Sequence, residues 1–161
     1  MERLWSPWRM EYIESHKGED HPDGCVFCAL LAGEDGEDRI LKRTERAFVT
    51  LAKYPYNPGH LLVLPVRHTG DLEDLSAEED AEIAALLKTC LRVLREEEPH
   101  GFNVGLNLGR VAGAGIPDHL HWHVVPRWGG DTNFMPVVGE TRVLPQLLDD
   151  TYRRLKPAFD R

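Results

Sequence analysis

Residues 118–126 read Asp118-His119-Leu120-His121-Trp122-His123-Val124-Val125-Pro126, and in this run three histidines alternate with apolar residues. Successive side chains of a β-strand point to opposite faces, so the run predicts a strand that places the three imidazoles on one face. The apolar residues would then face a core and the imidazoles a cleft. Imidazole titrates near neutral pH and can act as nucleophile, acid, base or metal ligand. The alternative is a histidine-rich exposed strand, and the regular spacing favours a functional one.

The composition fits one soluble domain and excludes some classes of partner. The chain has 161 residues, which suffice for a single domain with a hydrophobic core. Its 19 basic and 27 acidic residues give a formal charge of −8, which argues against binding to a nucleic-acid polymer. A small phosphorylated ligand stays compatible with this charge, because a few local donors in a cleft can hold it.

The sequence also indicates where the protein resides. No apolar run is long enough to span a membrane, and residues 1–7 lack the apolar run of a signal peptide. Three cysteines in such a chain do not suggest a disulfide framework. We therefore expect a cytoplasmic protein with no membrane partner.

The hydrophobic patterns predict an α+β domain with a mainly antiparallel sheet. Strands are expected at residues 39–42, 47–51, 60–65 and 102–108 and from His119 onward. Helices are expected at 6–13, 25–31 and 141–155, and a long one from a capping box at Ser76-Ala77-Glu78-Glu79 through Leu94. Cys90 lies on the apolar face of this helix, which predicts a small core residue and not a reactive thiol. We expect one domain over residues 1–161, divided into an N-terminal extension 1–24, a core 25–128 and a tail with a closing helix 129–161.

Cys25-Val26-Phe27-Cys28 places two thiols three residues apart, as in one half of a tetrahedral zinc site. His68 and His119 are the candidates for the other two ligands, and such a site would tie the N-terminal turn to the sheet. Two alternatives stay open at this point. One is a pair of unligated buried thiols, and the other is a redox pair, which would need a thioredoxin-like βαβ context that the sequence lacks.

The loop before the histidine run, residues 109–118, is rich in glycine and includes Gly113 and Gly115. Glycine lets backbone N–H groups approach an anion closely, so this loop is a candidate phosphate cradle beside His121. A plain turn is an equally good interpretation of the loop taken alone. No Gly-Lys-Ser/Thr sequence ends it, so it is not a Walker A loop.

A neutral imidazole beside such a cradle can attack phosphorus when a backbone carbonyl holds one ring nitrogen and the other keeps its lone pair. The attack splits one substitution into two through a phosphohistidine intermediate. A neighbouring histidine can hydrogen-bond the phosphate oxygens or help to protonate the leaving group. Loop N–H donors and a local cation such as Arg127 would stabilise the developing charge.

With these features the chain resembles the histidine triad family of nucleotidyl hydrolases and transferases. The family signature is His-φ-His-φ-His-φ-φ, where φ is apolar, and residues 119–125 satisfy it at every position. Asn57-Pro58-Gly59-His60 and the strand that leads to His68 resemble a second landmark of the family, and the likeness covers roughly residues 25–128. Trp5-Ser6-Pro7-Trp8-Arg9 and residues 126–134 resemble the branch that includes bacterial diadenosine tetraphosphate phosphorylases.

The resemblance implies a role for each matching residue. His121 would be the nucleophile that becomes adenylylated, His123 would contact the phosphate, and Asn107 would place a polar side chain on the phosphate. In zinc-bearing members four positions ligate a structural zinc, and they match Cys25, Cys28, His68 and His119. The resemblance also implies a two-layer α+β unit with its sheet paired across a homodimer or within a higher homo-oligomer. It further implies a nucleotide substrate and no organic cofactor.

Two positions depart from the family pattern. Ala52 stands where many members carry Asn or Asp for the ribose hydroxyls. Ile116 stands where hydrolase and phosphoramidase branches carry Ser or Thr, and the missing hydroxyl disfavours an aminoacyl-phosphoramidase.

Three hypotheses follow, in order of preference. The first is nucleotidyl transfer from a dinucleoside polyphosphate such as diadenosine tetraphosphate through adenylylated His121, with phosphate or water as the acceptor. The second is a zinc-dependent hydrolase in which His119 and His121 ligate a catalytic ion. The third is a protein that binds AMP without turnover.

Overall fold

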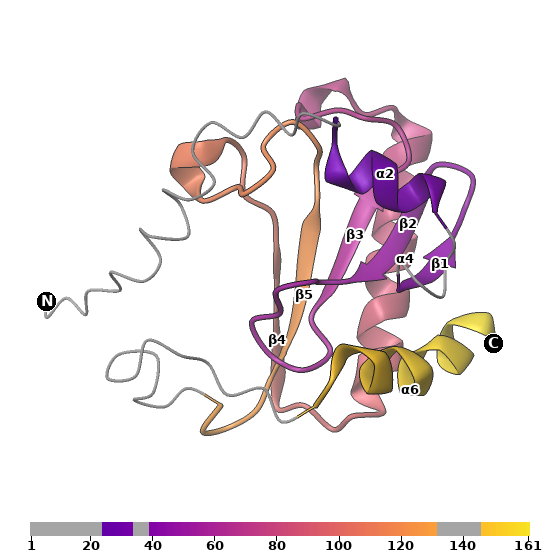
Figure 1. Ribbon diagram of the computed structural model, residues 1–161, viewed down its shortest axis with the longest axis vertical. Helices are drawn as coiled ribbons and strands as arrows, with labels where there is room; N and C mark the ends of the chain where they lie inside the picture. Colours follow the sequence, from indigo (N-terminus) through magenta and orange to yellow (C-terminus); the bar gives the residue numbers. More distant parts are fainter. Residues whose placement is uncertain (1–23, 34–38, 132–145) are drawn as a thin grey trace, which may run out of the picture.

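The computed structural model describes residues 24–33, 39–131 and 146–161 (Figure 1). The helices are α2 (Val26–Ala32), α4 (Ala77–Arg95) and α6 (Leu148–Asp160), with 3-10 turns η1 (Leu72–Asp74) and η2 (Arg110–Ala112). The strands are β1 (Ile40–Arg43), β2 (Ala47–Leu51), β3 (Leu61–Pro65), β4 (Gly101–Gly105) and β5 (Trp122–Arg127). The helix predicted at 6–13 lies outside the described residues. Among the described residues, no helix has both the length and the apolar character needed to cross a bilayer.

The five strands form one sheet in the order β1-β2-β3-β5-β4, and each neighbouring pair is antiparallel. The predicted α+β class with an antiparallel sheet is therefore confirmed. Leu62 of β3 pairs with His123 of β5, and Gly105 of β4 pairs with His123 on the other side. His123 therefore has a paired strand on each side, and it lies near the end of the sheet where β5 begins.

The two faces of the sheet bury two separate clusters. Alternate residues of β2 and β3, such as Val49 and Val63, pack with α4 and α6 on one face. Phe48, Leu62 and Leu64 pack on the other face with Phe27 of α2. In Figure 1 α2 lies in front of the sheet and α4 behind it, which agrees with these two clusters. Cys90 is fully buried in the α4 cluster, which confirms its prediction as a core residue.

Three elements have boundaries that differ from the prediction by more than one residue. β5 begins at Trp122 and not at His119, because the backbone N–H of Leu120 donates to Thr69 outside the sheet ladder. β4 ends at Gly105, three residues before the predicted end. α6 begins at Leu148 and continues through Asp160, whereas the prediction ended this helix at residue 155.

The predicted capping box at the start of α4 is present, and it also anchors the segment that follows β3. The Ser76 hydroxyl accepts from the Glu79 amide, and the Glu79 carboxylate accepts from the Ser76 amide at 2.8 Å. The same carboxylate forms a bidentate pair with Arg67, with both N–O distances 2.9 Å. The contacts with Arg67 and with the Ser76 amide lower the pKa of Glu79 to about 2. The residue after Arg67 is His68, so this pair fixes the approach to a candidate metal ligand.

We expect Glu79→Gln to lower the free energy of unfolding by about 2 kcal/mol at pH 7, since hydrogen bonds to a buried charge are lost. A carboxyl with a lowered folded-state pKa stabilises the fold above its unfolded pKa, and this contribution disappears as the pH falls toward about 2. The difference in free energy of unfolding between wild type and Glu79→Gln should therefore become smaller from pH 5 to pH 2. This range is roughly the one between the unfolded and the folded pKa of Glu79. Urea unfolding at several pH values measures it. The exposed Glu73→Gln is the control, with an expected change below about 0.5 kcal/mol, and a pH-independent Glu79→Gln difference would contradict the assignment.

Candidate active site and metal centre

His121 lies just before β5 and has one ring nitrogen fixed by the backbone. Its Nδ1 lies 2.8 Å from the carbonyl oxygen of His119, and a carbonyl can only accept, so the Nδ1 carries the hydrogen. In the neutral ring Nε2 then keeps its lone pair. Burial lowers the pKa of His121, which keeps the imidazole neutral near pH 7 although the carbonyl contact opposes this shift. These are the two conditions for a nucleophilic imidazole.

His123, the third histidine of the triad, is the one that lies inside β5. Its ring lies beside that of His121, with centroids 5.1 Å apart. Its Nδ1 lies 2.9 Å from Nε2 of His60, the residue just before β3. Burial, with a smaller contribution from His121, lowers the pKa of His123 to about 4. The site thus holds two neutral imidazoles side by side at neutral pH.

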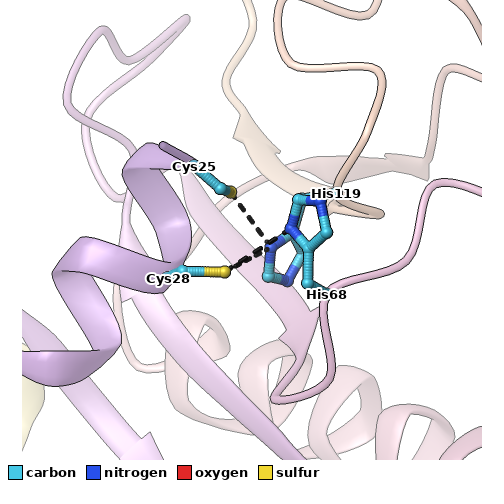
Figure 2. A group of neighbouring side chains, drawn as sticks. All are labelled: Cys25, Cys28, His68 and His119. Atoms are coloured by element: carbon cyan, nitrogen blue, oxygen red, sulfur yellow. Dashed lines mark hydrogen bonds between the residues drawn. The ribbon is translucent and has the colours of Figure 1, made fainter. Parts of the chain in front are cut away.

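The third candidate group is the cluster Cys25, Cys28, His68 and His119, which Figure 2 shows converging from α2, the segment after β3 and the segment before β5. Their ligand atoms all lie within 4.8 Å of one another. Sγ of Cys25 lies 3.3 Å from Nδ1 of His119, and Sγ of Cys28 lies 3.5 Å from Nδ1 of His68 and 3.7 Å from that of His119. Ligands at 2.0–2.3 Å from one ion in tetrahedral directions would be about 3.5 Å apart. The cluster therefore has the spacing and the donor set of a zinc site.

His119 connects the cluster to the nucleophile candidate. Its ring is fully buried, its Nδ1 faces the thiols, and its Nε2 donates to the carbonyl of Pro65 at 3.0 Å. A hydrogen bond of this kind orients a metal-ligating imidazole and fixes its tautomer. The carbonyl of the same residue holds His121. His121 is not among the four residues of the cluster, so the structure separates the candidate metal ligands from the candidate nucleophile.

Residues 106–118 carry the candidates for phosphate contacts. Gly113 adopts a left-handed conformation with φ 99°, which is strained for any residue that has a side chain. Its carbonyl oxygen accepts a hydrogen bond from Nδ2 of Asn107 at 3.4 Å. Gly115 is exposed in the following turn. The loop also contains the 3-10 turn η2, which the sequence did not predict. The phosphate roles of Asn107, Gly113 and Gly115 stay predictions.

Arg127 is held at the far end of β5 from the reactive histidines. Its Nε and Nη2 donate to the Asp131 carboxylate, and Nη1 donates to Asn103 at 2.7 Å. It lies four residues after His123, a distance of about 13 Å along the strand. The structure therefore does not bring Arg127 beside His121, and its guanidinium is held instead by Asp131 and Asn103.

Sequence reasoning gave no role to three residues that the structure places at the site. His60 is buried and contacts His123, which could be foreseen only from the β3–β5 register. Phe27, inside the Cys-x-x-Cys turn, packs on the rings of both His119 and His121. Gly70 leaves room for the backbone before His119, since a Cβ there would lie 2.6 Å from the carbonyl oxygen of Pro117. A glycine two residues after His68 was the only available signal.

The chain is similar to known proteins in sequence and in fold. A family model, the HIT domain, matches residues 34–130. Over all of its length the chain is 43% identical to a Mycobacterium tuberculosis protein named AP-4-A phosphorylase, of which it covers 86%. It is 30% identical to an uncharacterized HIT-like protein of Methanocaldococcus jannaschii, over 82% of this chain and 98% of that protein. The crystal structure of a Zn-bound histidine triad family protein from Mycobacterium smegmatis matches with a TM-score of 0.67 and 32% identity, over 84% of this chain and 93% of that one.

Proposed function

The chain belongs to the HIT family of nucleotidyl transferases and hydrolases, and from this premise we propose that it cleaves dinucleoside polyphosphates such as diadenosine tetraphosphate. One observation carries the proposal. The carbonyl of His119 holds Nδ1 of His121 and leaves the lone pair of Nε2 for attack. The full-length likeness to a protein named AP-4-A phosphorylase supports the choice of substrate class.

In the first step Nε2 of His121 attacks the α-phosphorus. A bond forms between this nitrogen and phosphorus, and the bond from phosphorus to the bridging oxygen of the leaving nucleotide breaks. His123 donates a hydrogen bond to the phosphate oxygens or to the leaving oxygen. The N–H groups of residues 109–118 that make no hydrogen bond within the loop would stabilise the developing charge. In the second step phosphate or water takes the adenylyl group from His121 and frees the ring.

Cys25, Cys28, His68 and His119 would hold a structural zinc. The near-tetrahedral spacing of the four side chains and the hydrogen bond from His119 to Pro65 support this assignment, as does the Zn-bound relative. Four protein ligands would close the coordination shell, so the ion would contribute to folding and leave the chemistry to His121. A catalytic zinc on His119 and His121 is disfavoured because the two residues point their ring nitrogens to different partners.

Incubation with diadenosine tetraphosphate, with and without inorganic phosphate, tests the proposal. Phosphorolysis yields ADP and ATP, whereas hydrolysis yields AMP and ATP. We expect ATP under at least one condition, and the second product identifies the acceptor. No cleavage under either condition, with AMP bound tightly, would favour the AMP-binding hypothesis and reject the enzymatic one.

Ile116 argues against an aminoacyl-phosphoramidase activity, as the sequence comparison with that branch of the family suggested. Its side chain packs against the cluster of Phe48 and Leu64 and offers no hydroxyl to a leaving group. Ala52 is buried in the same cluster, so a ribose contact would come from another residue.

We further propose that the protein is a single-domain homodimer of the cytoplasm. β4 is the last strand of the sheet, with β5 on one side and no strand on the other among the described residues. An edge strand offers unpaired backbone groups to a second copy. Cys25, Cys28 and Cys90 form no disulfide, which suits a reducing compartment. Light scattering tests the dimer, with a monomer as the contradicting result.

A further inference from the structure

We propose that Tyr56 is a positioning residue for this reaction. Its backbone amide and its ring together hold His123 in the form that donates a hydrogen bond from Nε2 toward the substrate. The inference rests on the proposed function, and it concerns a residue in the turn between β2 and β3 that the family resemblance does not assign.

The backbone amide of Tyr56 contacts the ring of His60. The backbone nitrogen of Tyr56 lies 3.0 Å from Nδ1 of His60. A backbone N–H can only donate, so Nδ1 of His60 must accept and carries no hydrogen. The neutral ring of His60 then has its hydrogen on Nε2. The position of this proton is set by the main chain and not by solvent, because His60 is only 2% exposed.

The proton on Nε2 of His60 in turn determines the tautomer of His123. Nε2 of His60 lies 2.9 Å from Nδ1 of His123, and since the former donates, the latter accepts. Neutral His123 therefore carries its hydrogen on Nε2. Among the described residues, none forms a hydrogen bond with this nitrogen. If His123 had the opposite tautomer, two N–H groups would face each other across this contact. If His60 had the opposite tautomer, two lone pairs would face each other.

The consequence is that the two adjacent reactive rings carry opposite tautomers. His121 has its hydrogen on Nδ1 and presents a lone pair at Nε2, whereas His123 presents an N–H at Nε2. The first group attacks phosphorus and the second donates to an oxygen. With the other tautomer, His123 would turn a second lone pair toward the phosphate and repel it.

The ring of Tyr56 supports the same arrangement from outside. Its centroid lies 4.8 Å from that of His60 and 5.7 Å from that of His123, with interplanar angles of 23° and 25°. One aromatic ring thus stacks on both members of the hydrogen-bonded pair, and such stacking limits rotation of the imidazoles. Tyr56 is 43% exposed, so little of its ring contributes to the hydrophobic core, and a purely structural role would not require these two contacts.

The test compares Tyr56→Leu, which keeps the amide and removes the stacking ring, with Tyr56→Phe, which keeps both. NMR of the histidine ring nitrogens reports the tautomer of His123 without any need for activity. We expect the Nε2–H form in wild type and in Tyr56→Phe. In Tyr56→Leu we expect a mixture of tautomers, because without the stacked ring the imidazole of His60 can rotate away from the amide that fixes its proton. Turnover of diadenosine tetraphosphate should fall about tenfold in kcat for Tyr56→Leu, a part of the 10²–10⁴-fold that a positioned acid contributes. KM should change little, and Tyr56→Phe should match wild type.

Two results would overturn the inference. One is a single His123 Nε2–H tautomer in Tyr56→Leu with kcat equal to that of wild type. The other is a loss in Tyr56→Phe as large as in Tyr56→Leu, which would assign the effect to the hydroxyl. A wild-type protein that turns over no substrate while its His123 tautomer responds to Tyr56→Leu would instead reject the proposed function, so the two failures can be told apart.

Discussion

His121→Ala should lower kcat for diadenosine tetraphosphate cleavage by at least about 10³-fold while the fold stays intact. The variant removes the only described imidazole whose Nδ1 is held by a backbone carbonyl beside the candidate phosphate loop. Loss of a nucleophile removes the whole two-step path, so the effect exceeds that of losing one acid or base. Steady-state kinetics measures the loss, and circular dichroism with thermal unfolding checks the fold.

His100→Ala provides the matched control, because this histidine is exposed and lies before β4. It should retain kcat within about twofold, as expected for a surface position remote from the chemistry. Turnover of His121→Ala close to that of wild type would mean that another residue takes the adenylyl group, or that water attacks directly.

The second large effect is expected on stability, from loss of the metal cluster. Purified protein should contain one zinc per chain, and Cys28→Ser should contain none. Zinc held by four side chains from distant segments stabilises only the folded state. A loss of about 3 kcal/mol would lower the melting temperature by roughly 10 °C in a domain of this size. Metal analysis and thermal unfolding measure the two quantities together.

Cys90→Ala is the control for this experiment, since Cys90 is buried in the α4 cluster and away from the four ligands. It should keep its zinc and lose at most the small packing energy of one sulfur. Zinc added back to chelated wild type should restore the melting temperature. A Cys28→Ser variant with full zinc content, or with the melting temperature of wild type, would contradict the assignment of the metal centre.

Local patterns were sufficient to predict much of this fold. The alternation in residues 119–125, the capping box at Ser76 and the apolar face with Cys90 each depend on neighbours in sequence. The Cys25 and Cys28 pair was also visible locally, and its partners His68 and His119 came from spacing and resemblance. The structure brings these four residues together.

Long-range contacts explain what the sequence could not show. The period-two pattern extended the strand to His119, but the hydrogen bond from Leu120 to Thr69 takes that residue out of the ladder. His60 contacts His123 only because β3 and β5 pair in a register that sets Leu62 opposite His123. Arg127 lies an even number of residues after His123 on β5, so both side chains are expected on the same face of the sheet. This placement and the short distance in sequence suggested a phosphate contact. Its pairing with Asp131 at the other end of the strand could not be foreseen.

The most direct test of the central claim is to trap the covalent intermediate. Protein mixed rapidly with diadenosine tetraphosphate in the absence of phosphate is quenched, digested and analysed by mass spectrometry under conditions that preserve phosphoramidate bonds. We predict one adenylyl group on His121, formed at a rate that supports turnover and discharged when phosphate or water attacks it. Cleavage of the substrate with the adenylyl group on any other residue, or with no adduct at any time during turnover, would contradict the account.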